Sequence, residues 1–580
     1  MRQIVKFTGK VKISLGIIGA LLLTAFTISK DGLFDVGKNL EIFSALYRQI
    51  NVHYVENIDT EDLMKTGINA MLNRLDPYTE FIPESDLEDF KLRYVSTKYS
   101  GLGAKILTKK DGSVYIAEIY EGYPAHRSGL RSGDRIISID GEQVKGKSAQ
   151  EISHLLKGNE YTNVDLEIQR ADNDELVEKQ IERANIIQPN ISYFSKNDQG
   201  IGYIKLDKFL TGAYEEMYEA LADLQEEKGI KGLVLDLRDN GGGILQESVK
   251  IVNLFVNKGE HVVTQKGKQL NKQIAYITNN TPILPDVPLV ILINEYSASA
   301  SEIVAGALQD MDRAVVMGQR SFGKGLVQQT YRLPYNNMVK VTVAKYYTPS
   351  GRCIQALDYA HKDAYGFGSK MDDSLITEFK TKNGRKVYNG NGIFPDITLE
   401  EEKLSPIAQK LLNELIIFDY ATLYYNTHKR VNKAADFSLS EDEYQSFTDY
   451  LIDLNFHYNP NSEKLLEQLR LAIDEEGKTP LLEEELAVMK EKLNNNDLDE
   501  LQFYKAEIKG LLEKEIVSRY YYQKGRYEYA MRHDNTFLAA EDILVAEEKQ
   551  LVYCDVLEGK GSFRTIGKPN VHLASSETFD

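Results

Sequence analysis

Two segments of the chain share one plan, in which a short apolar strand leads into a loop of small residues and then into a helix. The first strand, Gly232–Leu237, ends in the glycine loop Arg238–Gly243. The second, Val287–Ile293, is followed by the small residues Ser297–Ser301 and the helical stretch Glu302–Gln309. Strands that alternate with helices predict a layered α/β core with a buried sheet. In such a sheet, functional groups lie outside the carboxyl ends of the strands.

A lysine between two glycines, Gly323-Lys324-Gly325, follows the serine-rich loop. Serine is a weak nucleophile unless a base removes its proton and donors stabilise the oxyanion. No histidine lies between His261 and His361, so a local serine–histidine pair is unsupported. Lysine can replace histidine where burial lowers its pKa. We therefore predict a serine–lysine pair, for which the residues leave three serines open: Ser297, Ser299 and Ser301.

The same lysine has a competing interpretation as part of a phosphate-binding loop. Gly318–Lys324 matches the GxxxxGK pattern. The next residue is Gly325, where such a loop needs serine or threonine for magnesium, and the segment after it alternates like a strand. Both departures count against nucleotide binding. Two cysteines, Cys353 and Cys554, and scattered histidines give no metal-binding spacing, so we expect no cofactor and no metal.

The N-terminus has the pattern of an export signal. Basic residues, from Arg2 to Lys12, precede the apolar run Ile13–Ile28. The run is shorter than the roughly 20 residues that span a bilayer comfortably, and no A-x-A cleavage site or lipobox cysteine follows it. We expect an inner-membrane anchor with the chain after Lys30 facing the periplasm, or a periplasmic protein after signal cleavage. A net charge of -18 argues against a nucleic-acid partner.

The region from Tyr99 to Arg170 consists of short β-like runs separated by turns. Its motifs are Ser100-Gly101-Leu102-Gly103 ahead of a strand and the segment GDRIISIDG at Gly133–Gly141. These resemble a PDZ domain in the circular order found in bacterial PDZ proteases. Such domains bind peptide C-termini by adding a strand to a sheet edge. The resemblance implies that the terminal carboxylate is held by four residues: Ser100, Gly101, Leu102 and Gly103.

A wider resemblance covers about Leu33 to Glu400. The segment SASASEIVAGALQD, then SFGKGLVQ, with DLRDNGGG upstream and the PDZ-like region before it, is similar to the C-terminal processing (tail-specific) serine peptidases. The resemblance implies a crotonase/Clp-protease-like α/β peptidase core. It also implies roles for six residues. They are the nucleophile Ser299, the general base Lys324, the lysine-positioning residue Gln328, the oxyanion-hole residues Gly242 and Ala300, and an acidic residue, Asp310, that we expect to be structural.

Two positions depart from the family pattern. Gly241 stands where the glycine loop usually has proline, and Cys353 stands where the family commonly has serine. Residues 403–580 lie outside the resemblance and read as mostly helical. We interpret their charge runs as solvated helix faces, and we expect this part to support a homo-oligomer or to bind an adaptor.

The sequence therefore predicts a multidomain α/β protein. Its expected parts are a signal segment (1–30), an N-terminal helical segment (31–97), a PDZ domain (98–172), a serine peptidase core (173–402) and a helical C-terminal domain (403–580). The expected function is that of an endopeptidase of the cell envelope that recognises proteins with exposed apolar C-terminal tails. Two rival functions remain: an inactive scaffold that only binds tails, and an adaptor built on the helical C-terminal part.

Overall fold

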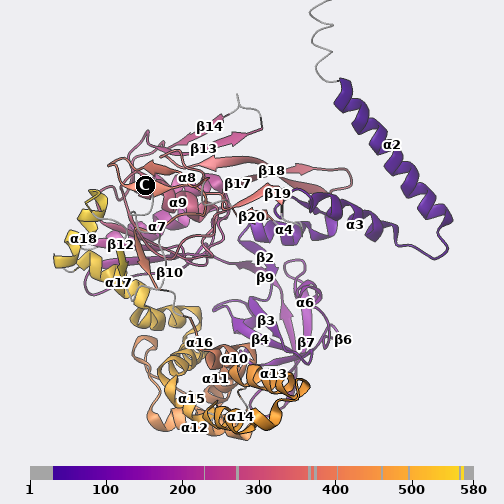
Figure 1. Cartoon of the computed structure of the whole chain (residues 1–580), viewed down its shortest axis with the longest axis vertical. Coiled ribbons are helices and arrows are strands. Elements are labelled where there is room, and N and C mark those ends of the chain that lie inside the picture. The colour runs from indigo at the N-terminus through magenta and orange to yellow at the C-terminus, as the bar shows by residue number, and fades with distance from the viewer. Residues whose placement is uncertain are drawn as a thin grey trace, which may run out of the picture. The chain divides into compact units, whose positions relative to one another are not determined.

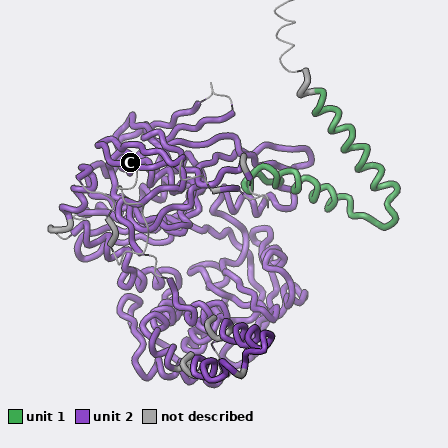
Figure 2. Tube along the Cα trace, viewed as in Figure 1, with its two compact units in different colours: residues 1–81 green, residues 82–580 purple. Residues whose placement is uncertain are grey.

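The computed structural model describes residues 30–226, 229–268, 273–362, 368–370, 375–400, 403–456, 458, 461–493, 497–545, 547–560 and 564–566. The predicted signal segment therefore lies outside the described residues, apart from Lys30. The chain divides into two compact units, residues 1–81 and 82–580, which Figure 2 shows in different colours.

The first unit contains two helices, α2 (Lys30–His53) and α3 (Thr60–Leu72). Helix α3 begins at Asp59, whose side chain accepts hydrogen bonds of 3.0 Å from the backbone N–H groups of Glu61 and Asp62. The two helices agree with the predicted helical segment. Within the described residues, no helix is both long and apolar enough to cross a membrane.

The PDZ region is built on an antiparallel sheet in the order β3-β4-β5-β7-β8, with β3 at one edge. Strand β8 pairs with β7 over its whole length, from Leu176 to Glu182, so the sheet continues beyond the predicted boundary at residue 172. A separate pair of strands, β2 and β9, precedes and follows the sheet. The elements are β2 (Lys98–Gly101), β3 (Ala104–Thr108), β4 (Val114–Ile119), α5 (Pro124–Arg127), β5 (Arg135–Ile139), β6 (Glu142–Gln143), α6 (Ala149–Leu156), β7 (Asn163–Gln169), β8 (Leu176–Glu182) and β9 (Ala184–Ile187).

The peptidase core is organised by a sheet in the order β10-β11-β12-β15-β16-β23-β24, parallel except for β10. Every residue of β12 and β15 is buried, which explains why both segments are apolar without alternation. The strands are β10 (Ile191–Lys196), β11 (Ile201–Leu206), β12 (Gly232–Asp236), β15 (Leu289–Ile293), β16 (Val315–Gly318), β23 (Ile397–Leu399) and β24 (Arg564–Ile566).

Helices cover both faces of this sheet (Figure 1). Leu235 and Ile291 pack with α7 (Ala213–Gln225), α8 (Leu245–Val252) and α9 (Ala300–Asp310). The neighbouring residues Val234 and Val290 point the other way, toward two late helices. These helices are α17 (Asn535–Val545) and α18 (Glu547–Leu557). The predicted boundary at residue 402 is therefore not the end of the core, because residues 535–557 supply the second layer of its hydrophobic core.

Among the described residues, most of the remaining C-terminal helices, but neither α13 nor α14, contribute side chains to a separate hydrophobic core. Helix α12 is capped by Ser440, which forms a capping box with Glu443. This helical bundle contacts the PDZ region, where Lys109 Nζ lies 2.7 Å from an Asp419 carboxylate oxygen. The helices are α10 (Pro406–Asn413), α11 (Ile416–Thr427), α12 (Glu441–Asp453), α13 (Asn461–Glu475), α14 (Thr479–Leu493), α15 (Asp497–Phe503) and α16 (Lys505–His533).

A second, antiparallel sheet flanks the core, and one of its strands, β17, starts at Leu326, shortly after Lys324. Strand β18 pairs with both β13 and β17. Its strands are β13 (His261–Gly267), β14 (Gln273–Ile277), β17 (Leu326–Arg332) and β18 (Met338–Tyr347), and short strands follow at β19 (Leu357–Lys362), β20 (Gly368–Lys370), β21 (Glu378–Lys380) and β22 (Lys386–Tyr388).

Candidate active site

The serine-rich loop joins β15 to α9 at the carboxyl edge of the core sheet. Ser299 is the residue that immediately precedes α9, with φ 58° and ψ −110°. Positive φ is costly for a residue with a Cβ atom, and it persists only where the surroundings enforce it. Such strained positions cluster at functional sites, and a sharp strand-to-helix turn holds the side chain out from the sheet.

The three candidate serines have different environments. The Ser297 hydroxyl donates to the carbonyl oxygen of Leu237 at 2.8 Å, and the Ser301 hydroxyl donates to that of Asn240 at 2.8 Å. Both serines are fully buried, whereas Ser299 is partly exposed. A nucleophile must reach its substrate, so the geometry favours Ser299. The sequence alone offered no physical reason for that choice.

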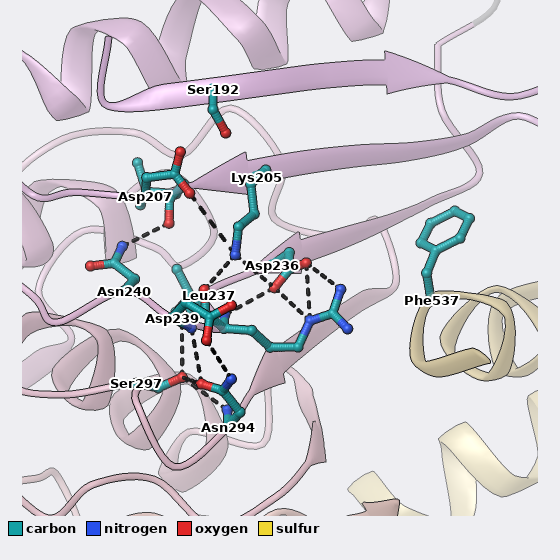
Figure 3. A network of polar contacts seen from close by, with 12 residues as sticks. Ser192, Lys205, Asp207, Asp236, Leu237, Asp239, Asn240, Asn294, Ser297 and Phe537 are labelled. Carbon is teal, nitrogen blue, oxygen red and sulfur yellow. Dashed lines mark hydrogen bonds and ion pairs between the residues drawn. The ribbon is translucent and has the colours of Figure 1, made fainter. Parts of the chain in front are cut away.

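Hydrogen bonds join the glycine loop after β12 to the segment that contains the serine-rich loop, and Figure 3 shows this region from close by. The side chain of Asn240 donates to the Leu206 carbonyl at 2.7 Å, and its backbone carbonyl accepts from the Ala298 N–H at 3.0 Å. Nearby, the Asn294 amide donates to the Asp239 carboxylate at 2.8 Å. These bonds fix the two loops relative to each other.

Gly242 lies directly against the turn that carries Ser299. A Cβ atom at Gly242 would stand 2.6 Å from the Ala298 carbonyl oxygen and 2.8 Å from the Ala300 nitrogen, and φ is +93°. Only glycine fits there, and the predicted oxyanion-hole residues Gly242 and Ala300 are therefore neighbours. In this structure the Gly242 N–H donates to the Asn240 side-chain oxygen at 2.9 Å. Gly241 has no atom within 4 Å of its would-be Cβ.

Glu302, which the sequence analysis did not select, joins the serine and lysine segments. Its Oε2 accepts hydrogen bonds from the backbone N–H groups of Ser299 (2.7 Å) and Lys324 (2.9 Å). Its Oε1 accepts from the Gly323 N–H (2.7 Å) and the Ser321 hydroxyl (2.5 Å). The predicted nucleophile and base are therefore brought together through one carboxylate. The signal in the sequence was the S-x-x-E spacing at the start of α9.

Complete burial raises the pKa of Glu302 to about 7, although the bonds from Ser321, Ser299, Lys324 and Gly323 act in the opposite direction. Burial penalises the charged form, and hydrogen bonds to the carboxylate favour it. Because its pKa lies so near neutrality, this carboxyl changes its protonation state within the range in which most enzymes work.

The glycines beside Lys324 allow the lysine loop to approach its neighbours closely. A Cβ atom at Gly323 would lie 2.5 Å from that of Ala356, and one at Gly325 would lie 2.8 Å from the Gln355 nitrogen. Lys324 itself is partly buried. The preceding residue, Phe322, is 49% exposed.

Gln328 and Asp310 lie in different surroundings. Gln328, on β17, donates from Nε2 to the Thr342 hydroxyl at 3.3 Å. Asp310 ends α9, about 16 Å along the helix axis from Ser299 at 1.5 Å per residue, and its carboxylate lies 2.8 Å from the Arg352 guanidinium. The structural role expected for Asp310 stays a prediction.

The PDZ region contains a cavity of about 380 Å³ beside the free edge of β3. Gly101 and Leu102 of the predicted carboxylate loop line it, together with Ile106 of β3 and Leu156 of α6. Gly103 has φ +77° at the close approach of the loop to Tyr123, while Ser100 pairs with β9. The cavity, the edge strand and the adjacent helix are the parts that strand addition by a peptide requires.

A short helix, α4 (Leu87–Tyr94), also borders this cavity. Leu92 contributes to its lining, and the Asp89 carboxylate lies 2.8 Å from Lys157 Nζ, just after α6.

Comparison with protein families agrees with this arrangement. Residues 200–360 match peptidase family S41, and residues 115–170 match a PDZ domain. Residues 407–544 match a domain described as "Probable PDZ-protease, C-terminal helical domain".

Two curated relatives are each 33% identical to this chain. The carboxy-terminal-processing protease of Bartonella bacilliformis aligns over 62% of this chain and 81% of its own length. A probable CtpA-like serine protease of Staphylococcus aureus (strain MSSA476) aligns over 66% and 75%. A solved photosystem II D1 C-terminal processing protease is 28% identical over 57% of this chain and 91% of its own, with a TM-score of 0.33 that adds no support for the whole-chain arrangement. The chain belongs to the carboxy-terminal-processing proteases of family S41, which are serine peptidases, and it carries a PDZ domain and a C-terminal helical domain.

Proposed function

We propose that the peptidase works through a serine–lysine pair in which Ser299 is the nucleophile and Lys324 is the general base. One observation carries the assignment. The backbone N–H groups of both residues bond to the same Glu302 oxygen, at 2.7 and 2.9 Å. Ser299 is also the partly exposed member of the three loop serines.

In this mechanism the Lys324 amine, in its neutral form, takes the proton of the Ser299 hydroxyl as the oxygen attacks a peptide carbonyl. The backbone N–H groups of Ala300 and Gly242 stabilise the oxyanion. For this, Gly242 must turn its N–H from the Asn240 side chain or share it with the substrate. Lys324 then gives the proton to the leaving amine, and water, activated by the same lysine, hydrolyses the ester. Gln328 positions the lysine.

We further propose that the PDZ domain selects substrates by their C-termini. A tail would add as a strand along the free edge of β3, with its carboxylate at the loop Ser100–Gly103. The cavity beside that edge is lined by apolar residues such as Leu102, Ile106 and Leu156, so a tail ending in an apolar side chain fits it best. The substrates are therefore proteins with exposed, apolar C-terminal tails.

The basic N-terminal segment and the apolar run after it support a place in the cell envelope. In this proposal the chain is exported and faces the periplasm, either anchored in the inner membrane or released by signal cleavage. The C-terminal helices would bind an adaptor or a second copy, and exposed apolar side chains such as Leu465, Leu481 and Phe503 support that role. Protease accessibility in intact and opened cells, followed by fractionation, tests the location.

The catalytic assignment is tested with a labelled, unstructured polypeptide that ends in an apolar residue with a free carboxylate. Ser299→Ala and Lys324→Ala should each abolish cleavage while the protein still binds the tail. Ser446→Ala on α12 and Lys380→Ala on β21 change the same residue types at exposed positions and should cleave at the parent rate. Cleavage by Ser299→Ala at the parent rate would exclude the assignment. A parent protein that binds tails without cutting any would favour the inactive scaffold.

A further inference from the structure

Tyr346, on β18, contacts both catalytic loops through its hydroxyl group. The residue is buried, with 1% of its surface exposed. Its hydroxyl oxygen lies 2.6 Å from the Lys324 carbonyl oxygen and 3.0 Å from the Ser299 carbonyl oxygen. A phenol has one proton, so the two carbonyls share a single donor. The contact joins residues that are 47 and 22 positions away from Tyr346.

Glu302 makes the complementary contacts. Its Oε2 accepts from the N–H groups of Ser299 and Lys324 at 2.7 and 2.9 Å, whereas the Tyr346 hydroxyl donates to the carbonyls of the same two residues. Each residue of the proposed pair is thus held at its N–H by a carboxylate and at its C=O by a phenol. The two holding groups come from α9 and β18, and both are buried.

The two loops need such restraint for different reasons. Ser299 has a strained backbone, which persists only if its surroundings over-determine it. Lys324 stands between two glycines, one of which has φ +85°, so the local chain does little to fix its own conformation.

We propose that Tyr346 and Glu302 are positioning residues that together set the separation of Ser299 from Lys324. The inference rests on the proposed function, because it assigns a role relative to that pair. A displacement of about 1 Å between reacting groups can lower a rate by roughly 100-fold. Loss of either contact should therefore act on the chemical step rather than on the binding of the substrate's tail by the PDZ domain.

The test compares Tyr346→Phe with Tyr347→Phe in the full-length protein, with the labelled tailed polypeptide described above. Both variants lose one phenolic hydroxyl from β18, but the Tyr347 ring contacts Lys266, whose Nζ lies 4.0 Å from the ring centre. Tyr346→Phe should lower kcat by roughly 10- to 100-fold and leave KM within about twofold. Tyr347→Phe should leave both constants near those of the parent.

Glu302→Gln provides the second arm, because it keeps the side-chain length but turns one acceptor oxygen into an N–H donor. Each carboxylate oxygen accepts a hydrogen bond from at least one backbone N–H group. In either orientation of the glutamine amide, its NH₂ group would therefore face a backbone N–H group and could not accept a hydrogen bond from it. Its kcat should also fall. Because both residues restrain the same pair, the double variant should lose less than the product of the two single losses.

Circular dichroism and size exclusion give the folded fraction, by which each rate is divided. A merely structural role would lower the folded fraction and leave the corrected kcat unchanged, and that result overturns the inference. It is also overturned if Tyr346→Phe keeps kcat within about twofold of the parent while Ser299→Ala is inactive. If Ser299→Ala is itself active, the proposed function fails first, so the two failures can be told apart.

Discussion

The ion pair between Asp310 and Arg352 offers the sharpest test of which acidic residues take part in chemistry. Both side chains have 0% exposure, and the guanidinium Nη2 lies 2.8 Å from a carboxylate oxygen. The other carboxylate oxygen accepts from the Ser350 N–H at 3.0 Å, and the guanidinium also donates to the Gln309 side chain at 2.7 Å. The variant Asp310→Asn keeps an acceptor for Ser350 but removes the negative charge that is paired with Arg352.

The expected cost is large because the remaining charge stays buried. Removal of one partner from a buried ion pair typically costs about 3–5 kcal/mol, whereas replacement of both partners is often close to neutral. Asp310→Asn should therefore destabilise α9 and its surroundings by about 3 kcal/mol or more. Asp310→Asn combined with Arg352→Met removes both charges and should recover at least about 1 kcal/mol of that loss.

The assay must be local. The protein has several domains, so a single global unfolding free energy is not defined, and it contains no tryptophan to report on one region. Hydrogen exchange measured on peptides from α9 gives the local opening free energy directly. Asp172→Asn, at a partly exposed ion pair with Arg131 in the PDZ region, is the control and should leave the exchange of α9 unchanged.

Activity completes the test. With Asp310 about 16 Å along the helix from Ser299, the folded fraction of Asp310→Asn should keep the parent kcat at low temperature. The reasoning is refuted if the variant loses kcat by 100-fold or so while the exchange of α9 stays at the parent level. Asp310 would then act in the reaction itself.

Three further outcomes follow from the same contacts. Gly242→Ala should abolish cleavage because its Cβ would lie 2.6 Å from the Ala298 carbonyl oxygen, while Gly241→Ala should be active, and assays of tail cleavage compare them. Burial raises the pKa of Glu302 from 4.5 to about 7. The folded state then binds more protons than the unfolded state between these values, so local stability at α9 should fall by on the order of 3 kcal/mol as pH rises through that window. Hydrogen exchange of α9, measured at the two ends of this pH range, should show the fall in local stability in the parent protein and a much smaller fall in Glu302→Gln. A variant truncated after Asp534 lacks α17 and α18 and should yield no soluble peptidase core. Size exclusion and circular dichroism test this expectation, and an intact core in this variant would contradict it.

Much of the architecture could be predicted because local patterns encode it. The segments of β12 and β15 are apolar throughout, so both of their faces must be buried, as in the middle of a sheet. The small residues after each strand indicated the loops of the site. The rest depended on contacts between distant residues. Glu302 looked like an ordinary residue of a helix start, and Tyr346 like one of many strand tyrosines. Their partners became visible only once the strands were placed side by side.

The C-terminal helices show a similar limit. The sequence predicted that residues 403–580 are mostly helical, but a helix prediction does not say which surface each helix covers. The predicted helical domain 403–580 did not indicate that Leu544, near its end, packs on the face of the core sheet that includes Val234.

That packing has a consequence for the order of events during synthesis. Domains form as the chain emerges from its N-terminus, and Ser299, Lys324 and Glu302 are all made long before α17 and α18. Until residues 535–557 have emerged, Val234, Val290 and Leu292 have no cover on one side of the sheet. The nascent chain therefore carries every proposed catalytic group before its core is complete, and we expect cleavage of tailed substrates only after the last helices have packed.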